Sequence, residues 1–116
     1  MRSITDVELA QKEYKLLQKI KKNLDHLLSG GSVFLFGSRA RGDSKDDSDW
    51  DILIITENIN EEIKSNILKT LYDIELEENV IINPLILSRN AWENDHFACH
   101  PIHAHIESEG ILLTYE

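Results

Sequence analysis

Hydrophobic residues near the start of the chain recur at helical spacing. Between residues 5 and 28 they are mostly separated by three or four positions, which places them along one face of an amphipathic helix. The residues on this face are Val7, Ala10, Tyr14, Leu17, Ile20, Leu24, Leu27 and Leu28. Thr5 and Glu8 form a capping-box pattern at its start, and Gly30 follows its end. We therefore predict a helix over residues 5–28, whose apolar face belongs to the core or to a contact with another subunit.

Three shorter apolar segments are typical of β-strands. "SVFLFG", which begins at Ser32, and "WDILIIT", residues 50–56, are rich in branched and aromatic residues, which indicates strands buried inside a sheet. A third strand is predicted over residues 79–88. Pro84 lacks the amide hydrogen that a strand ladder needs, so this third strand should lie at an edge or pair on one side only at that point.

The remaining segments predict three further helices. Asn60 is a suitable N-cap for a helix that continues to about Glu77. Ser88 precedes a short helix in "RNAWEND", and Pro101 begins a last helix, "PIHAHIESE", that Gly110 closes. The order helix, strand, strand, helix, strand, helix predicts an α/β or α+β fold in which helices pack against a small mixed sheet.

The chain has the size of one small domain. With 116 residues, of which 41% are hydrophobic, we expect a single domain over residues 1–116 that ends in a helical segment over 89–116. The formal net charge of -9 repels the phosphate backbone of nucleic acids, which argues against general nucleic-acid binding. There is one cysteine, no apolar run long enough for a membrane span, and no signal-peptide pattern, so we expect a cytoplasmic protein.

Asp49 and Asp51 lie two positions apart at the beginning of the second predicted strand. The period of two in a strand sends both carboxylates to the same side, where they can share a divalent cation. Protein carboxylates that hold Mg²⁺ commonly do so together with the phosphates of a substrate. The pair therefore favours a nucleoside triphosphate carried on Mg²⁺ or Mn²⁺ over a metal cage made by the protein alone.

A phosphate-binding turn is predicted just before this carboxylate pair. Gly37 lets a ligand approach the backbone closely, and the hydroxyl of Ser38 can donate to a phosphate oxygen. A helical turn after Ser38 would point free backbone amides in the same direction. The cationic residues of this segment are Arg39, Arg41 and Lys45. Each fragment alone is ordinary turn material, and only their joint spacing points to a phosphate site.

The sequence Gly37-Ser38, ten residues, then Asp49-x-Asp51 resembles the signature of the DNA polymerase β-like nucleotidyltransferase superfamily. The longer stretch "GSRARGDSKDDSDWDILI" is similar to its small branch, the minimal nucleotidyltransferases (MNT). The resemblance implies a nucleotidyltransferase fold in which Gly37 and Ser38 bind the triphosphate of ATP or another nucleotide, while Asp49 and Asp51 are catalytic residues that hold Mg²⁺. It also implies transfer of a nucleoside monophosphate, AMP in the first place, to a hydroxyl of a protein or another acceptor.

The resemblance further implies a third carboxylate on a later strand, and here the chain departs from the pattern. The later strand is "VIINPLIL", and the expected position holds Asn83, which can offer an oxygen to a cation but cannot accept a proton. Three interpretations stay open. One metal suffices, or Glu75 or Glu77 takes the third place, or catalysis has been lost and the chain only binds a nucleotide or neutralises a partner.

The resemblance also bears on the acceptor. Minimal nucleotidyltransferases are often encoded beside HEPN-domain proteins in toxin–antitoxin pairs, which implies a HEPN-type partner that the antitoxin modifies. A cationic small molecule, as in aminoglycoside-modifying relatives, is an alternative that suits the acidic surface. A homo- or hetero-oligomer is compatible with either acceptor.

The aromatic and histidine residues outside the motif are assigned to packing. Trp50 alternates with the two aspartates, so its side chain should point into the core on the opposite side of the strand. Trp92 should pack its short helix on the sheet rather than cover a nucleotide base. "DHFACHPIHAH" contains zinc-ligand residue types, but Pro101 breaks their helical register, so we expect a packing segment rather than a zinc site.

Overall fold

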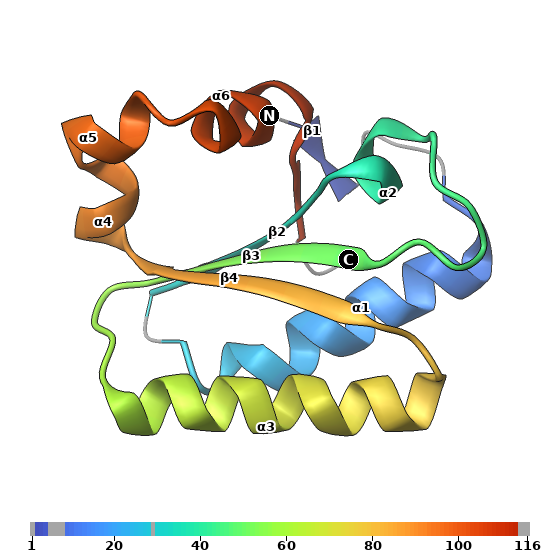
Figure 1. Ribbon diagram of the computed structural model, residues 1–116. Coiled ribbons are helices and arrows are strands. Elements are labelled where there is room, and N and C mark those ends of the chain that lie inside the picture. The colour runs from blue at the N-terminus through green and yellow to red at the C-terminus, as the bar shows by residue number, and fades with distance from the viewer. Residues whose placement is uncertain (1, 5–8, 29, 114–116) are drawn as a thin grey trace.

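A five-stranded mixed sheet forms the centre of the computed structural model, which describes residues 2–4, 9–28 and 30–113 (Figure 1). From one edge to the other, the strands are β1 (Arg2–Ser3), β5 (Ile111–Leu112), β2 (Ser32–Phe36), β3 (Trp50–Thr56) and β4 (Ile82–Ser88). The pairs β1–β5 and β3–β4 are parallel, and β2 runs antiparallel to both of its neighbours. The predicted α/β class with a small mixed sheet is confirmed.

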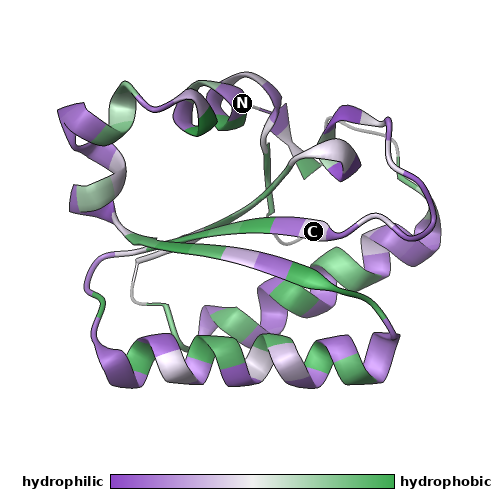
Figure 2. Cartoon of the chain, viewed as in Figure 1, coloured by the Kyte–Doolittle hydropathy of each residue, from purple (hydrophilic) through white to green (hydrophobic). Residues whose placement is uncertain are grey.

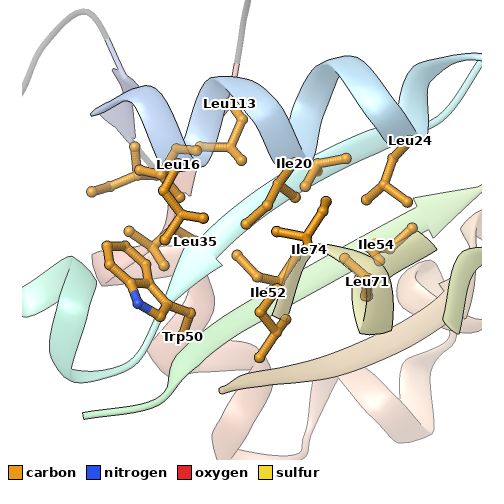
Figure 3. Packing of buried hydrophobic residues seen from close by; sticks show 14 of the residues in the cluster. Leu16, Ile20, Leu24, Leu35, Trp50, Ile52, Ile54, Leu71, Ile74 and Leu113 are labelled. Carbon is orange, nitrogen blue, oxygen red and sulfur yellow. The ribbon is translucent and has the colours of Figure 1, made fainter. Parts of the chain in front are cut away.

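Helices α1 (Gln11–Asp25) and α3 (Glu61–Glu78) cover one face of the sheet, as Figure 1 shows. They bury a cluster of aliphatic side chains against the strands, seen in Figure 3. Its labelled members include Leu16, Ile20 and Leu24 from α1, Leu71 and Ile74 from α3, and Leu35, Ile52 and Ile54 from the sheet. Each such side chain contributes about 1.5–3 kcal/mol when fully buried, so this face supplies most of the core.

The opposite face has a lighter cover. Helices α4 (Arg89–Glu93), α5 (Asp95–Ala98) and α6 (Pro101–Glu109) lie over it, and α2 (Ser38–Arg41) follows the end of β2 (Figure 1). Leu53, Ile55 and Ile106 are its buried residues, with Leu85 and Trp92 packed around them and partly exposed. The predicted packing of Trp92 agrees with this, since its ring also stacks on His103 at a centroid distance of 4.1 Å. None of the helices in the described part of the chain is long and apolar enough to cross a membrane.

Several boundaries differ from the sequence-based prediction, and the first helix ends at Asp25 rather than at residue 28. The first helix begins at Gln11 because Ala10 has an extended backbone (φ -59°, ψ 146°), while the expected capping pair Thr5 and Glu8 lies outside the described residues. The third strand begins at Ile82 rather than residue 79, because Asn79 adopts a left-handed conformation (φ 54°) that ends α3. The single helix expected after Ser88 is divided at Asn94, whose side chain accepts from the amide of His96 and begins α5.

Two strands and their position in the sheet were not predicted. β1 and β5 have two residues each, too few to show an alternating pattern. β5 nevertheless lies inside the sheet, between β1 and β2, and Ile111 is 1% exposed. Its position depends on pairing between distant parts of the chain, which no local pattern records.

Strand β4 is the edge that Pro84 predicted. The amide of Trp50 donates to the carbonyl of Ile81, so the alternate residues from Ile82 onward direct their backbone groups away from β3. The outward amide of Ile82 donates to the carboxylate of Glu75 at 2.9 Å, and Pro84 has no amide hydrogen to offer. These two features protect the edge from pairing with another strand.

Two leucines of α3 provide a test of this packing. Leu71 is 2% exposed and Leu76 is 67% exposed, although both belong to the same helix. Leu71→Ala should lower the free energy of unfolding by about 2–5 kcal/mol because it opens a cavity in the core. Leu76→Ala should change it by no more than about 0.5 kcal/mol. Urea denaturation measures both values, and similar losses in the two variants would contradict the placement of α3.

Candidate functional site

The alternation of β3 directs the side chains of Trp50 and Asp51 to opposite faces of the sheet. Trp50, Ile52 and Ile54 point toward α1 and α3, whereas Leu53 belongs to the cluster on the opposite face. Asp51 shares the side of Leu53, since it is two positions away in the strand. Figure 2 shows the result as a hydrophilic band near the start of β3, beside a second one in β4, on strands that are otherwise hydrophobic.

Asn83 lies beside both aspartates. It is the register partner of Asp51 in the parallel pair β3–β4. Its Nδ2 donates to Oδ2 of Asp49 at 2.8 Å and lies 3.5 Å from Oδ1 of Asp51, at the limit of a hydrogen bond. The structure therefore brings Asp49, Asp51 and Asn83 together, with the amide nitrogen directed at the two carboxylates.

Gly37 passes directly beside the carboxylate of Asp51. Phe36 pairs with Asp51 across β2 and β3, so the next residue of the chain runs along the Asp51 side chain. The backbone of Gly37 has φ 76° and ψ -158°, a conformation that only glycine adopts readily. A Cβ at this position would overlap Oδ2 of Asp51 and lie 3.0 Å from its Cγ. The missing side chain therefore joins the turn and the carboxylate pair into one site.

The four-residue helix α2 begins immediately after this glycine. The amides of Ala40 and Arg41 both donate to the carbonyl of Gly37 at 3.0 Å. The amides of Ser38 and Arg39 precede them in the first turn, where helical backbone donors have no partner within the helix. Because Gly37 contacts Asp51, these donors and the carboxylates lie next to each other, an arrangement that suits an anion carried on a cation.

Arg39 is directed away from the carboxylates. Its guanidinium donates to the carbonyls of Ser48 (2.9 Å) and Asp46 (3.2 Å), and lies 4.4 Å from the ring centroid of Trp50. Trp50 points toward α1, on the opposite side of β3 from Asp51. Arg39 therefore holds the loop between β2 and β3 in place, a role that the sequence did not suggest.

Arg41 and Lys45 have different surroundings. Nη1 of Arg41 lies 3.0 Å from Oε2 of Glu109, and Nε lies 3.2 Å from the carboxylate of Asp43. Lys45 instead borders a cavity of about 790 Å³ beside the start of α1, which Arg39 and Trp50 also line. Among the three predicted cations, it is Arg41 whose charge acts on Asp51.

Burial raises the pKa of Asp51 above its ordinary value, and the nearby charge of Asp49 raises it further. The hydrogen bond from Asn83 and the charge of Arg41 act in the opposite direction without cancelling the effect. The site thus holds two adjacent carboxylates whose repulsion is incompletely compensated by the protein. Two hard oxygen ligands in this state fit a divalent cation such as Mg²⁺.

The alternative third ligands lie elsewhere. Glu75 accepts the amide of Ile82, and Glu77 forms an ion pair with Lys19 at 2.6 Å, both on the face covered by α1 and α3. Within residues 2–4, 9–28 and 30–113, no cluster of three or more His, Cys, Asp and Glu side chains could hold a metal ion. This covers the histidine-rich segment, in which the ring of Phe97 contacts the rings of His100 and His103.

Comparison with known proteins agrees with the nucleotidyltransferase resemblance. A family model described as "nucleotidyltransferase domain" matches residues 17–111. Over 78 residues the chain is 31% identical to a Methanocaldococcus jannaschii protein named as a candidate protein adenylyltransferase, and the match covers 65% of this chain and 79% of that protein.

Two solved structures share the fold. A toxin–antitoxin crystal structure with AMP-PNP has a TM-score of 0.59 and 15% identity, covering 83% of this chain and 70% of that one. A candidate nucleotidyltransferase from Sulfolobus solfataricus has a TM-score of 0.50 and 22% identity, covering 88% and 82%. At these identities the likeness concerns the fold.

Two glycines provide a test of the contact at the turn. Gly37→Ala should lower the free energy of unfolding by roughly 3 kcal/mol or more, because it combines backbone strain with overlap on Asp51. Gly42→Ala carries the strain of a positive φ (86°) but has open space around the new methyl, so a loss of about 1 kcal/mol is expected. Urea denaturation followed by tryptophan fluorescence measures both. Equal losses would show that the overlap with Asp51 is not the decisive term.

The pKa of Asp51 predicts a pH-dependent effect on stability. Because it is raised in the folded protein, ionisation of Asp51 lowers stability as the pH rises through that value. With EDTA at about pH 7, Asp51→Asn should therefore raise the melting temperature, by on the order of 2 °C. At about pH 3, where the carboxyl is protonated in both the folded and unfolded states, this gain should disappear.

Asp47→Asn in the exposed part of the loop controls for the loss of one negative charge from an acidic chain. Its melting temperature should follow that of the unmodified protein at both pH values. Thermal unfolding by circular dichroism is the measurement, and equal shifts in the two variants would contradict the local origin of the effect.

Proposed function

Since the chain belongs to the nucleotidyltransferase domain family, we propose that it transfers AMP from ATP to a hydroxyl group of an acceptor protein. The contact between Gly37 and Asp51 carries this proposal, because it joins a turn with free amide donors to a pair of carboxylates. A triphosphate with its metal ion needs the amide donors and the carboxylates in one place. The similarity to a candidate protein adenylyltransferase supports AMP as the transferred group and a protein as the acceptor.

Asp49 and Asp51 are the residues that would hold Mg²⁺ or Mn²⁺. Their carboxylates face the same side, and the pKa of Asp51 is raised in part by the charge of Asp49. When bound, the cation would neutralise phosphate charge and stabilise the pyrophosphate leaving group. Asn83 holds the two carboxylates in position through its amide.

In the proposed reaction, the acceptor hydroxyl oxygen attacks the α-phosphorus of ATP. A new oxygen–phosphorus bond forms while the bond from the α-phosphorus to the bridging oxygen breaks, and pyrophosphate leaves with that electron pair. The hydroxyl proton passes to solvent, since Asn83 cannot accept it. The amides of Ser38 and Arg39 would hold the triphosphate, and Arg41, whose charge acts on Asp51, would add positive charge beside the phosphates while it stays paired with Glu109.

The acceptor is proposed to be a separate protein. Elements other than the strands of the site serve mainly to cover the sheet, so the acceptor hydroxyl would come from another chain. A neighbour of the same fold belongs to a toxin–antitoxin structure with AMP-PNP, which supports a protein partner and an adenine nucleotide. Together with the minimal nucleotidyltransferase resemblance, this favours a HEPN-type toxin as acceptor and this chain as its antitoxin, with both in the cytoplasm.

Asn83 favours one alternative function. Without a third carboxylate the chain could serve as a module that binds a nucleotide or neutralises a partner without turnover. Glu75 and Glu77 do not fill the third place, because they are held on the other face of the sheet. This module would bind ATP and the partner but would release no pyrophosphate.

Label transfer separates the two functions. With Mg²⁺, ATP labelled at the α-phosphate and the product of the neighbouring gene, we expect label on that protein and release of pyrophosphate. The double variant Asp49→Ala with Asp51→Ala should reduce the rate by on the order of 100-fold or more, because the metal ligands are lost. Asp47→Ala in the exposed loop should leave the rate unchanged. ATP and partner binding without label transfer would instead support the module without turnover.

A further inference from the structure

We infer that the site takes one divalent cation for each bound nucleotide, and that Asn83 is the residue that limits it to one. The inference rests on the proposed function in one respect, namely that Asp49 and Asp51 hold the cation. It concerns the number of cations and the residue that sets it, which the proposed function leaves open.

The first step is the place of Asn83. It is paired with Asp51 in the register of β3 and β4, and its Nδ2 approaches both carboxylates, at 2.8 and 3.5 Å. A carboxylate here would touch the same two groups and could bridge a second cation to them. The described residues offer no third acidic, histidine or cysteine side chain at this place.

The second step is the charge of the site. Asp49 and Asp51 are the two carboxylates that the protein supplies, and together with the phosphates of the nucleotide they suffice for one divalent cation. A second cation would face the positive end of the Asn83 amide dipole, because the nitrogen points at the carboxylates. The amide could present its neutral oxygen only by giving up the 2.8 Å hydrogen bond to Asp49.

The third step concerns the other acidic side chains near the site, which already bind other groups of the protein. Glu75 caps the start of β4 by accepting the amide of Ile82 at 2.9 Å. Glu77 is bound to Lys19 on the face of α1. Glu109 lies on the same side of the sheet as the site, but its carboxylate is paired with Arg41 at 3.0 Å. None of the three is available as a second metal bridge without breaking a contact that holds an element in place.

The same geometry gives the amide a function in the metal-free protein. Its hydrogen bonds offset part of the repulsion between two carboxylates that the fold places side by side. An aspartate at position 83 would replace this donor with a third negative charge at a similar distance. Such a site should be destabilised without cations and should bind two of them.

Counting bound Mn²⁺ tests the inference directly. The probe is Mn²⁺ with an ATP analogue that carries a methylene bridge between the α- and β-phosphates, and electron paramagnetic resonance of free Mn²⁺ gives the stoichiometry. We expect one Mn²⁺ for each complex of the unmodified chain with the analogue, and two for Asn83→Asp. Asn60→Asp is the matched control, because Asn60 caps α3 by accepting the amide of Ile63, a role that aspartate also fills. It should bind one.

Thermal unfolding supplies a second readout. With EDTA, Asn83→Asp should melt below the unmodified chain, and added Mn²⁺ should raise its melting temperature more than it raises that of Asn60→Asp or the unmodified chain. Two Mn²⁺ in the unmodified complex, none in it, or one in Asn83→Asp would each overturn the inference. One Mn²⁺ with no AMP transfer to a verified partner would overturn the proposed function alone, whereas transfer with two Mn²⁺ would overturn only the inference.

Discussion

Strand β3 has to be buried on both faces and still begin with carboxylates, and this constraint organises the rest of the structure. Its alternation places Trp50, Ile52 and Ile54 under α1 and α3, so this helical layer can exclude water completely. The other face carries Asp51 at its open end and Leu53 farther along, where only short helices cover it. A fully covered second face would desolvate the carboxylates, so the light cover is a condition for a functional site there.

The β2–β3 pairing then places the Asp51 carboxylate beside the turn at Gly37. The antiparallel register sets Phe36 opposite Asp51, and the chain must leave the strand at the next residue without a side chain. Arg39 stabilises the β2–β3 loop from the opposite side of β3. Its guanidinium lies over the ring of Trp50 and donates hydrogen bonds to two loop carbonyls. Two neighbouring positions of β3 therefore fix this region, because Asp51 lies against Gly37 and Trp50 anchors the loop through Arg39.

Local patterns in the sequence predicted the elements whose signals lie within a few residues. The period of two in "WDILIIT" was enough to place Trp50 in the core, and Asn60 and Ser88 were identified as helix caps, which their side-chain hydrogen bonds to Ile63 and Ala91 confirm. The nucleotidyltransferase resemblance carried by the Gly-Ser and Asp-x-Asp spacing is confirmed by the family match over residues 17–111. The place of β5, the contact of Gly37 with Asp51 and the partners of Arg39 all depend on which strands pair and in which register, and that information is not local.

The first and last described strands of the sheet, β1 and β5, pair with each other across nearly the whole length of the chain. Among the described strands, β1 pairs only with β5, and Arg2 reaches from it to the carbonyls of Ala40 in α2 and of Glu109, the latter 107 positions away. The strands that carry the site, β2, β3 and β4, come from one continuous stretch, whereas the contact that braces α2 requires closure of nearly the whole chain. During synthesis on the ribosome, strands β2, β3 and β4 with their carboxylates can therefore assemble before Arg2 contacts α2. That contact can form only after β5 has emerged.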